Sequence, residues 1–323
     1  MPKTEPTTLV DAIRMFADPD VALEYMVALR WPNGVACPTC GLLEPSWLQN
    51  VRRWQCRAKH PKRQFTVKVG TIMEDSAIPL DKWLAAIWLL ANDKNGISSY
   101  ELARGIGVTQ KSAWFMLQRI RLAMEDGTFN KMKGEIEADE TYIGGKARNM
   151  HHDRKVKTFG TGKPSGFGGK AAVMGFIQRE GPNGHSVVRA RQITSATRGE
   201  LEANVRENVE AGSALYTDGA GGYRFLGDEY VHGIVEHDAR QYVDGNITTN
   251  RIENFWALLK RSLGGTYISV EPFHLFRYLD EQVFRFNTRE LKDGERFKVA
   301  ATAIIGKRLT YAQLINSGSG SLA

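Results

Sequence analysis

The cysteines of this chain limit what its first part can fold into, because all three of them lie between residues 37 and 56 of 323. Cys37-Pro-Thr-Cys40 and Cys56-Arg-Ala-Lys-His60 form two close pairs separated by residues 41–55. Two such pairs can surround a tetrahedral Zn²⁺ with three thiolates and one imidazole. An odd, clustered set of cysteines does not suit disulfides. The alternative is a set of buried or redox-active thiols, but the spacing favours structural Zn²⁺ held by Cys37, Cys40, Cys56 and His60.

Hydrophobic periodicity divides the chain into four parts. Residues 1–76 hold N-terminal helices and the cysteine module, and residues 77–130 are helical. Short β-like runs with a helix among them predict an α/β domain over residues 131–290, with a mixed sheet flanked by helices. Residues 291–323 are expected to form C-terminal helices and a flexible tail. The predicted fold class is therefore multi-domain α+β.

The stretch "ISSYELARGIGVTQKSAWFMLQRIRLAM" (97–124) predicts two helices that meet at a turn containing Gly107. Ser98 or Ser99 can cap the first helix and Thr109 the second. In a helix-turn-helix the second helix enters the major groove of DNA. The side chains expected to face outward are Gln110, Lys111, Ser112, Gln118, Arg119 and Arg121, the first three as base-edge contacts. A helical hairpin without a DNA role has the same pattern.

Charge also favours nucleic acid as the partner. The chain carries a net charge of +7, which suits a polyanion such as double-stranded DNA. The segment "VRRWQCRAKHPKR" (51–63) has six Lys or Arg and no acid, which makes Arg52 and Arg53 candidates for phosphate contacts. The alternative is a solvated basic loop.

No segment of the sequence suits a membrane. The best apolar run, which starts at Trp83, has about half the length that a spanning helix needs. The N-terminus lacks the basic start and apolar stretch of a signal peptide. We therefore expect a cytoplasmic protein.

Carboxylates occur at unusual places in the predicted α/β domain. The strand "EIEADETYIGG" puts Glu135, Glu137 and Asp139 on one face, where buried carboxylates are costly unless they are paired or bind metal. Asp218 ends another apolar run, and strand ends of α/β sheets are common ligand sites. Together with Glu253, Asp139 and Asp218 can hold two Mg²⁺ (or Mn²⁺) ions for phosphodiester displacement. For each acid alone, the alternative is a surface residue or a helix cap.

The segment "TTNRIENFWALLKR" (248–261) predicts a helix with two different faces. Its docking face consists of Ile252, Phe255, Trp256 and Leu259. The opposite stripe consists of Asn250, Glu253, Ala257 and Lys260 and is expected to point at the metal site instead of solvent. We favour Glu253 as the third metal ligand and keep Asn250, one turn earlier, as the alternative. Lys260 lies on the same stripe, where it can steady a DNA phosphate.

These motifs, in this order, resemble the DDE-type transposases of bacterial insertion sequences, in the group with an N-terminal zinc ribbon and a helix-turn-helix. The resemblance runs from about Trp31 to Arg289. The segments that carry it are "CPTCG", "FTVKVGTIMEDSAIPLDKWLAAIWLL", "GISSYELARGIGVTQKSAWFMLQRIR", "ADETYIGGK", "YTDGAGGY", "TNRIENFWALLKR" and "LFRYLDEQVFRFNTR".

The resemblance implies an RNase H-like catalytic domain and cut-and-transfer chemistry at the terminal inverted repeats of an element. It carries catalytic roles over to Asp139, Asp218 and a third ligand on the helix, and Lys260 matches the basic residue at this spacing. Two DNA ends must be handled together, so we expect a homo-oligomer on DNA. The implied location is the nucleoid of a prokaryotic cell.

One position departs from the pattern of such enzymes. Relatives are expected to carry a His before the Thr-Asn pair, where this chain has Thr248, and His237 is a candidate substitute. Two other functions fit the same residues. One is a resolvase-like nuclease on the same fold, and the other is a domesticated DNA-binding regulator with a dead site. The intact acids and Lys260 count against the second.

Overall fold

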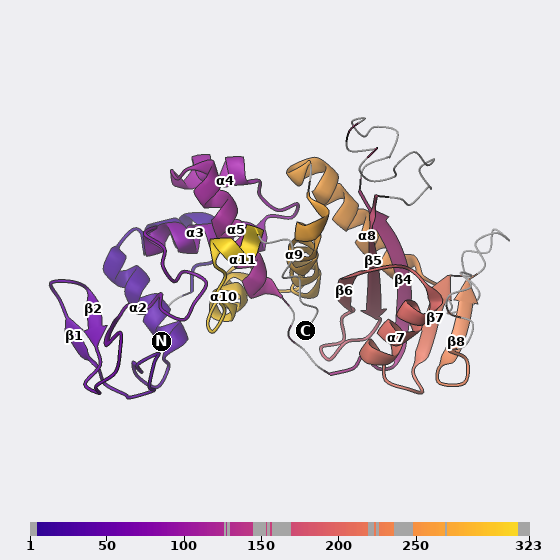
Figure 1. The fold of residues 1–323 in the computed structure, drawn as a ribbon, viewed down its shortest axis with the longest axis horizontal. Coiled ribbons are helices and arrows are strands. Elements are labelled where there is room, and N and C mark those ends of the chain that lie inside the picture. The colour runs from indigo at the N-terminus through magenta and orange to yellow at the C-terminus, as the bar shows by residue number, and fades with distance from the viewer. Residues whose placement is uncertain are drawn as a thin grey trace. The chain divides into compact units, whose positions relative to one another are not determined.

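The chain folds into two compact units (Figure 1). The computed structural model describes residues 5–125, 127, 130–144, 153, 156, 169–218, 223, 226–235, 248–268 and 270–315. Unit 1 consists of Met1–Glu125 and Thr288–Ala323, and unit 2 consists of Asp126–Asn287. The chain thus leaves unit 1 once, builds unit 2 and then returns to unit 1.

A small antiparallel sheet in unit 1 carries the cysteine module. Its strands, in spatial order, are β1 (Ser46–Leu48), β2 (Arg53–Gln55) and β3 (Gln64–Phe65). Trp54 faces Trp47 on one neighbouring strand and Phe65 on the other, with ring centroids 4.6 and 5.9 Å apart. Strands this short bury little apolar area, so the module needs a further source of stability.

The remainder of unit 1 is helical. Its helices are α1 (Leu9–Phe16), α2 (Pro19–Arg30), α3 (Leu80–Asn92), α4 (Ser99–Ile106), α5 (Gln110–Met124), α10 (Asp293–Ala303) and α11 (Tyr311–Ile315). Phe297 of α10 packs against Trp88 of α3 and Phe16 of α1, with ring centroids 5.1 and 5.8 Å apart. The C-terminal segment therefore completes the hydrophobic core of unit 1.

The turn between α4 and α5 follows the sequence prediction. Ser98 accepts a hydrogen bond from the backbone N–H of Glu101, whose carboxylate accepts from Ser98 N–H in return, which is a capping box. Gly107 ends α4 in the left-handed region, with φ of 63°. Thr109 then accepts from the backbone N–H of Ser112 and caps α5. The predicted caps and turn are confirmed.

Unit 2 is built on a mixed five-stranded sheet. The strands, in spatial order, are β6 (Val187–Ile193), β5 (Ala171–Gln178), β4 (Glu135–Ile143), β7 (Ala214–Asp218) and β8 (Val231–Val235). Strand β4 pairs antiparallel with β5 and parallel with β7, so it lies at the centre of the sheet. The predicted mixed sheet is confirmed.

Helices cover both faces of this sheet (Figure 1). Helix α7 (Arg198–Asn208) packs on one face, and α8 (Asn250–Ser262) and α9 (Leu275–Asn287) pack on the other. A π-helical turn (Leu263–Tyr267) follows α8, and a short 3₁₀ turn (Pro272–His274) precedes α9. The predicted docking face of α8 is confirmed, because its four residues are all at most 3% exposed. Within the described ranges, neither unit has a helix long and apolar enough to cross a membrane.

Candidate functional site

The parallel pairing of β4 and β7 brings Asp139 and Asp218 together. Glu137 of β4 lies opposite Tyr216 of β7. Continuing this register by two residues on each strand puts Asp139 level with Asp218, on the same face of the sheet. Asp139, Glu140 and Asp218 each offer one carboxylate oxygen, and these oxygens lie within 4.8 Å of one another. Asp139 and Asp218 therefore lie close together, as the sequence predicts.

The electrostatics of this acidic cluster (Asp139, Glu140 and Asp218) favour a cation. Burial, followed by the charges of Glu140 and Asp218, raises the pKa of Asp139 to about 7. Burial also raises the pKa of Glu140. A divalent cation relieves this repulsion, and an all-oxygen donor set is what Mg²⁺ and Mn²⁺ prefer. The residues present thus fit a hard divalent metal.

Glu140 is a member of the cluster that the sequence reasoning missed. Strand alternation assigns it to the face opposite Asp139, away from the metal site. Its carboxylate nevertheless reaches the two aspartates, and its Oε2 accepts a hydrogen bond of 2.6 Å from the hydroxyl of buried Tyr223. Two consecutive acids, Asp139 and Glu140, within a predicted strand were the available signal.

Helix α8 carries the other predicted catalytic residues at exposed positions. Asn250 is its first residue, and Glu253 and Lys260 follow on the same exposed stripe. Glu253 accepts a hydrogen bond of 3.1 Å from the hydroxyl of Thr249. Among the described acids, it is Glu140 and not Glu253 that joins the two aspartates within 4.8 Å. His237, the candidate substitute for the missing histidine, lies outside the described residues.

The start of α8 is held by strand β4. Thr249, at the N-cap position, makes no side-chain cap. Instead the carboxylate of Glu137, which is fully buried, accepts from the backbone N–H groups of Arg251 at 2.9 Å and Ile252 at 3.1 Å. Its other oxygen accepts from Arg179 Nε at 2.9 Å, and Arg179 also donates to the carbonyl of Thr248 at 3.0 Å. Glu137 therefore fixes the first turn of α8 two residues before Asp139.

Removing this cap is expected to loosen α8. Glu137→Ala leaves two helix N–H groups and the Arg179 guanidinium without their shared acceptor, which costs about 3–5 kcal/mol for a broken buried pair. The matched control is Glu135→Ala. Glu135 is the other carboxylate partner of Arg179, and the Glu135 side chain is 40% exposed. Loss of such an exposed ion pair is expected to cost about 0–1 kcal/mol of folding stability. Amide exchange of Arg251 and Ile252, with denaturant unfolding, measures both variants. Equal losses in the two would contradict the cap.

The four predicted zinc ligands converge in unit 1. Their ligand atoms lie within 4.8 Å of one another. Cys40 Sγ lies 3.6 Å from Cys56 Sγ, and Cys37 Sγ lies 3.5 Å from His60 Nε2. A tetrahedral Zn²⁺ with its usual bond lengths spaces two sulfurs about 3.8 Å apart and a sulfur and a nitrogen about 3.6 Å apart. The geometry therefore fits a structural zinc.

Contacts around the four ligands also support a structural zinc site. His60 Nδ1 lies 2.7 Å from the carbonyl of Pro61, a contact that turns Nε2 toward the thiols. Burial opposes the thiolate of Cys37, but hydrogen bonds from Cys40 and Thr39 outweigh it and lower the pKa of Cys37 to about 7. A thiol that is easily deprotonated suits a metal ligand.

Only part of α5 is exposed to solvent. Lys111 is exposed and Ser112 half-buried, while Gln110, also half-buried, donates to Ser99 Oγ at 2.8 Å. The expectation that Arg119 points outward is wrong, because it is 6% exposed. Its guanidinium donates to the carbonyls of Ile72, Glu74 and Leu309 at 2.8 to 3.0 Å.

Two further side chains of α5 were also predicted to face outward but are buried. Gln118 is fully buried and Arg121 is 1% exposed. The C-terminal segment also contacts the end of α5, where Lys307 donates to the carbonyls of Leu122 and Ala123. Within the described residues, the exposed part of this helix is therefore its first turn.

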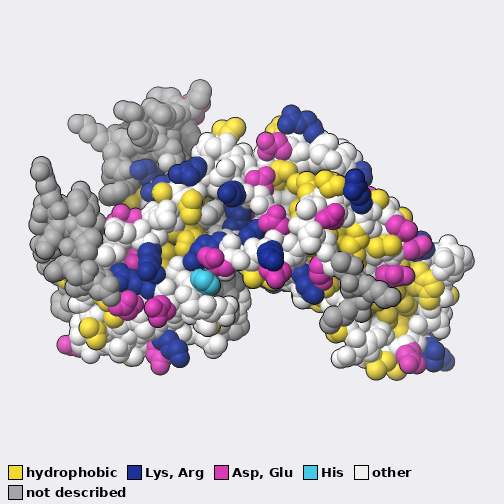
Figure 2. Space-filling view, turned by 180° about the vertical axis from the view of Figure 1, so that it is seen from behind, with side chains coloured by type: hydrophobic (Ala, Val, Ile, Leu, Met, Phe, Trp, Pro, Cys, Tyr) yellow, Lys and Arg dark blue, Asp and Glu magenta, His cyan; other side chains and the backbone are white. Residues whose placement is uncertain are grey.

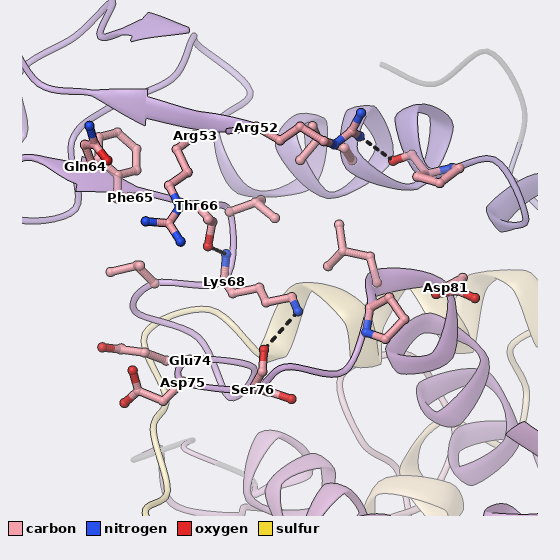
Figure 3. Close-up of a pocket in the computed structure, with 16 residues that line it drawn as sticks. Arg52, Arg53, Gln64, Phe65, Thr66, Lys68, Glu74, Asp75, Ser76 and Asp81 are labelled. Atoms are coloured by element: carbon pink, nitrogen blue, oxygen red, sulfur yellow. Dashed lines mark hydrogen bonds between the residues drawn. The ribbon is translucent and has the colours of Figure 1, made fainter. Parts of the chain in front are cut away.

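The two arginines of the cysteine module point in different directions (Figure 3). Arg52 forms an ion pair of 2.6 Å with Asp20 and turns toward the start of α2. Arg53 extends into a pocket of about 510 Å³ that is also lined by Lys68 and Glu74. The pocket carries both signs of charge, so it is not a dedicated anion site.

Both units contain a segment that matches a known protein family. Residues 131–287 match the family described as ISXO2-like transposase domain, and residues 18–58 match the transposase zinc-ribbon domain. Together the two matches span more than half of the chain. A similar protein is the "Uncharacterized protein in transposable element ISH50" of Halobacterium salinarum. It is 26% identical over 285 residues, which cover 84% of this chain and 94% of that protein. The chain belongs to the DDE-type transposases of insertion sequences, with a zinc ribbon ahead of an ISXO2-like catalytic domain.

Proposed function

We propose that this transposase cuts DNA at the terminal inverted repeats of its element and joins the freed 3′-hydroxyls to target DNA, with Mg²⁺ or Mn²⁺ as cofactor. The observation that carries the proposal is the convergence of Asp139, Glu140 and Asp218 inside the matched catalytic domain. A divalent metal pair supplies activation of the attacking oxygen and charge neutralisation at the leaving oxygen.

In this proposal, different residues of the chain bind the metal and the DNA phosphate. Asp139 and Asp218 hold the metal, and a residue on the first turn of α8, Glu253 or Asn250, completes the set. Lys260 lies on the same exposed stripe, where its charge can hold the DNA phosphate in line with the acids. The strand order β6-β5-β4-β7-β8, with three antiparallel strands followed by two parallel ones, supports an RNase H-like fold for residues 131–290.

DNA recognition is assigned to the N-terminal part of the chain. We propose that the zinc ribbon (residues 1–76) and a helix-turn-helix (residues 77–130) read the terminal repeats. In this arrangement Gln110, Lys111 and Ser112 contact base edges, and Arg53 contacts the backbone. On the face shown in Figure 2, described Lys and Arg side chains are interspersed with Asp and Glu. The first turn of α5 is the candidate surface because Lys111 is exposed there.

The assembly and location follow from the reaction. Both ends of an element must be cut and joined in one complex, so we propose a homo-oligomer that forms on DNA. The reaction takes place where element and target DNA lie, in the nucleoid of a prokaryotic cell. A resolvase-like nuclease and an inactive DNA-binding regulator are not favoured, because both matched domains are transposase domains.

Lys111→Ala is expected to weaken binding to terminal-repeat DNA. Losing one cationic contact lowers the slope of log K against log salt by about 0.9. The matched control is Lys94→Ala, which removes an equal charge at another exposed position of unit 1. Fluorescence anisotropy at several salt concentrations measures both. An unchanged slope for Lys111→Ala would remove this residue from the interface.

The proposed function is tested by incubating the full chain with labelled DNA that carries the element's terminal repeat, with Mg²⁺ and then with EDTA. Strand cleavage that depends on metal and on the repeat supports the proposal. Cleavage unaffected by EDTA would overturn it.

A further inference from the structure

We propose that Trp256 is a positioning residue for the catalytic carboxylate Asp139, and that Gly175 provides the space in which the indole ring does so. The proposal rests on the metal-binding role given to Asp139 above. It assigns to Trp256 a task beyond the packing that its place on the apolar face of α8 predicts.

A direct hydrogen bond links the two residues. The indole Nε1–H of Trp256 donates to Asp139 Oδ2 at 2.9 Å. The ring is 3% exposed, so water does not compete freely for this bond. An indole N–H is a donor only. It therefore holds the carboxylate as an acceptor and favours the charged form that a metal needs.

Gly175 determines how close the ring comes to the sheet. It lies opposite Asp139 in the pairing of β5 with β4. A Cβ added at Gly175 would lie 2.6 Å from Trp256 Cη2, 2.7 Å from Cζ2 and 3.0 Å from the end of Ile252. A glycine in a strand interior often marks such a close approach. Any larger residue there would push the indole away from Asp139.

The surroundings of Asp139 explain why it needs a dedicated donor. The carboxylate is half-buried and lies beside Glu140 and Asp218, whose charges repel its own. This repulsion favours movement of the Asp139 side chain away from its neighbours. A fixed donor on the helix opposes that movement and keeps the carboxylate in one orientation. Loss of a group that hydrogen-bonds to a metal ligand in this way typically lowers metal affinity 10- to 100-fold.

Trp256→Phe tests the proposal, because it keeps an aromatic ring and removes the N–H. Mn²⁺ affinity is measured on the zinc-bound full chain from which Mg²⁺ and Mn²⁺ have been removed, with Asp218→Asn giving the background from other sites. We expect the affinity of Trp256→Phe to fall by about 10- to 100-fold. The matched control is Leu259→Val, which removes one methylene from the same buried face and is expected to retain the affinity.

Wild-type affinity in Trp256→Phe would overturn the positioning role alone. Absence of Mn²⁺ binding in the wild type would overturn the proposed function, and this role with it.

A second measurement needs neither the Trp256 variant nor a metal. Of the seven tryptophans in the chain, only Trp256 falls in residues 126–287. With ¹⁵N-labelled tryptophan, Asp139→Asn is expected to shift the Trp256 indole resonance, because its acceptor loses its charge. Glu207→Gln, an exposed carboxylate of the same unit, serves as the control and is expected to leave the resonance in place. An indole resonance that is identical in wild type and Asp139→Asn would overturn the proposal.

Discussion

Replacing Asp218 with Asn is expected to abolish metal-dependent cleavage of terminal-repeat DNA. The amide keeps the shape of the side chain but removes one of the charges that would hold the metal in the proposed site. If the metal contributes about 4 kcal/mol to transition-state stabilisation, the rate falls roughly a thousandfold. Single-turnover cleavage of labelled DNA measures the loss, with Asp139→Asn as a second variant expected to behave alike.

The control for this experiment is Glu207→Gln, which removes a carboxylate on α7 whose side chain is 62% exposed. It is expected to cleave at the wild-type rate. Asn250→Ala, Glu253→Gln and Glu140→Gln, tested beside it, then identify the third member of the site by the size of their losses. Wild-type cleavage by both Asp139→Asn and Asp218→Asn would show that the catalytic assignment is wrong.

Loss of zinc is expected to unfold the small sheet of unit 1. Structural Zn²⁺ contributes about 10–16 kcal/mol to folding in small domains, which is far more than strands of two or three residues can supply. Cys56→Ser removes a fully buried ligand and is expected to release the metal. Metal analysis should find one zinc in the wild type and none in the variant, and amide protection should vanish over β1 to β3.

Unit 2 provides the internal control for zinc loss, because none of the four zinc ligands belongs to it. Its amide protection is expected to be the same in Cys56→Ser and in the wild type. A freshly purified wild-type protein without zinc would instead favour the alternative of buried or redox-active thiols.

Local patterns in the sequence were sufficient where the chemistry depends on neighbours along the chain. Cysteine spacing predicted the ligand set, and Ser98, Gly107 and Thr109 predicted the turn between α4 and α5. Alternation along β4 also placed Glu137 and Asp139 on one common face, and in the structure α8 covers that face.

Features that depend on distant segments were not predictable in this way. Arg119 was expected to face DNA because its helix was considered in isolation, yet it donates to a carbonyl 190 positions later in the chain. Glu137 was read as one of several acids in a strand, but it caps a helix that begins more than 110 positions after it. Glu140 was set aside by strict alternation, although carboxylate oxygens from both faces meet beside Asp218.

The return of the chain to unit 1 after Asn287 has a consequence for dissecting this protein. Unit 2 is an insertion within unit 1, since both of its ends continue into the same hydrophobic core. A single proteolytic cut between the units would leave the two fragments associated, because α10 remains packed on α3. Release of unit 2 requires two cuts, and a truncation from either terminus removes part of unit 1 before it reaches unit 2.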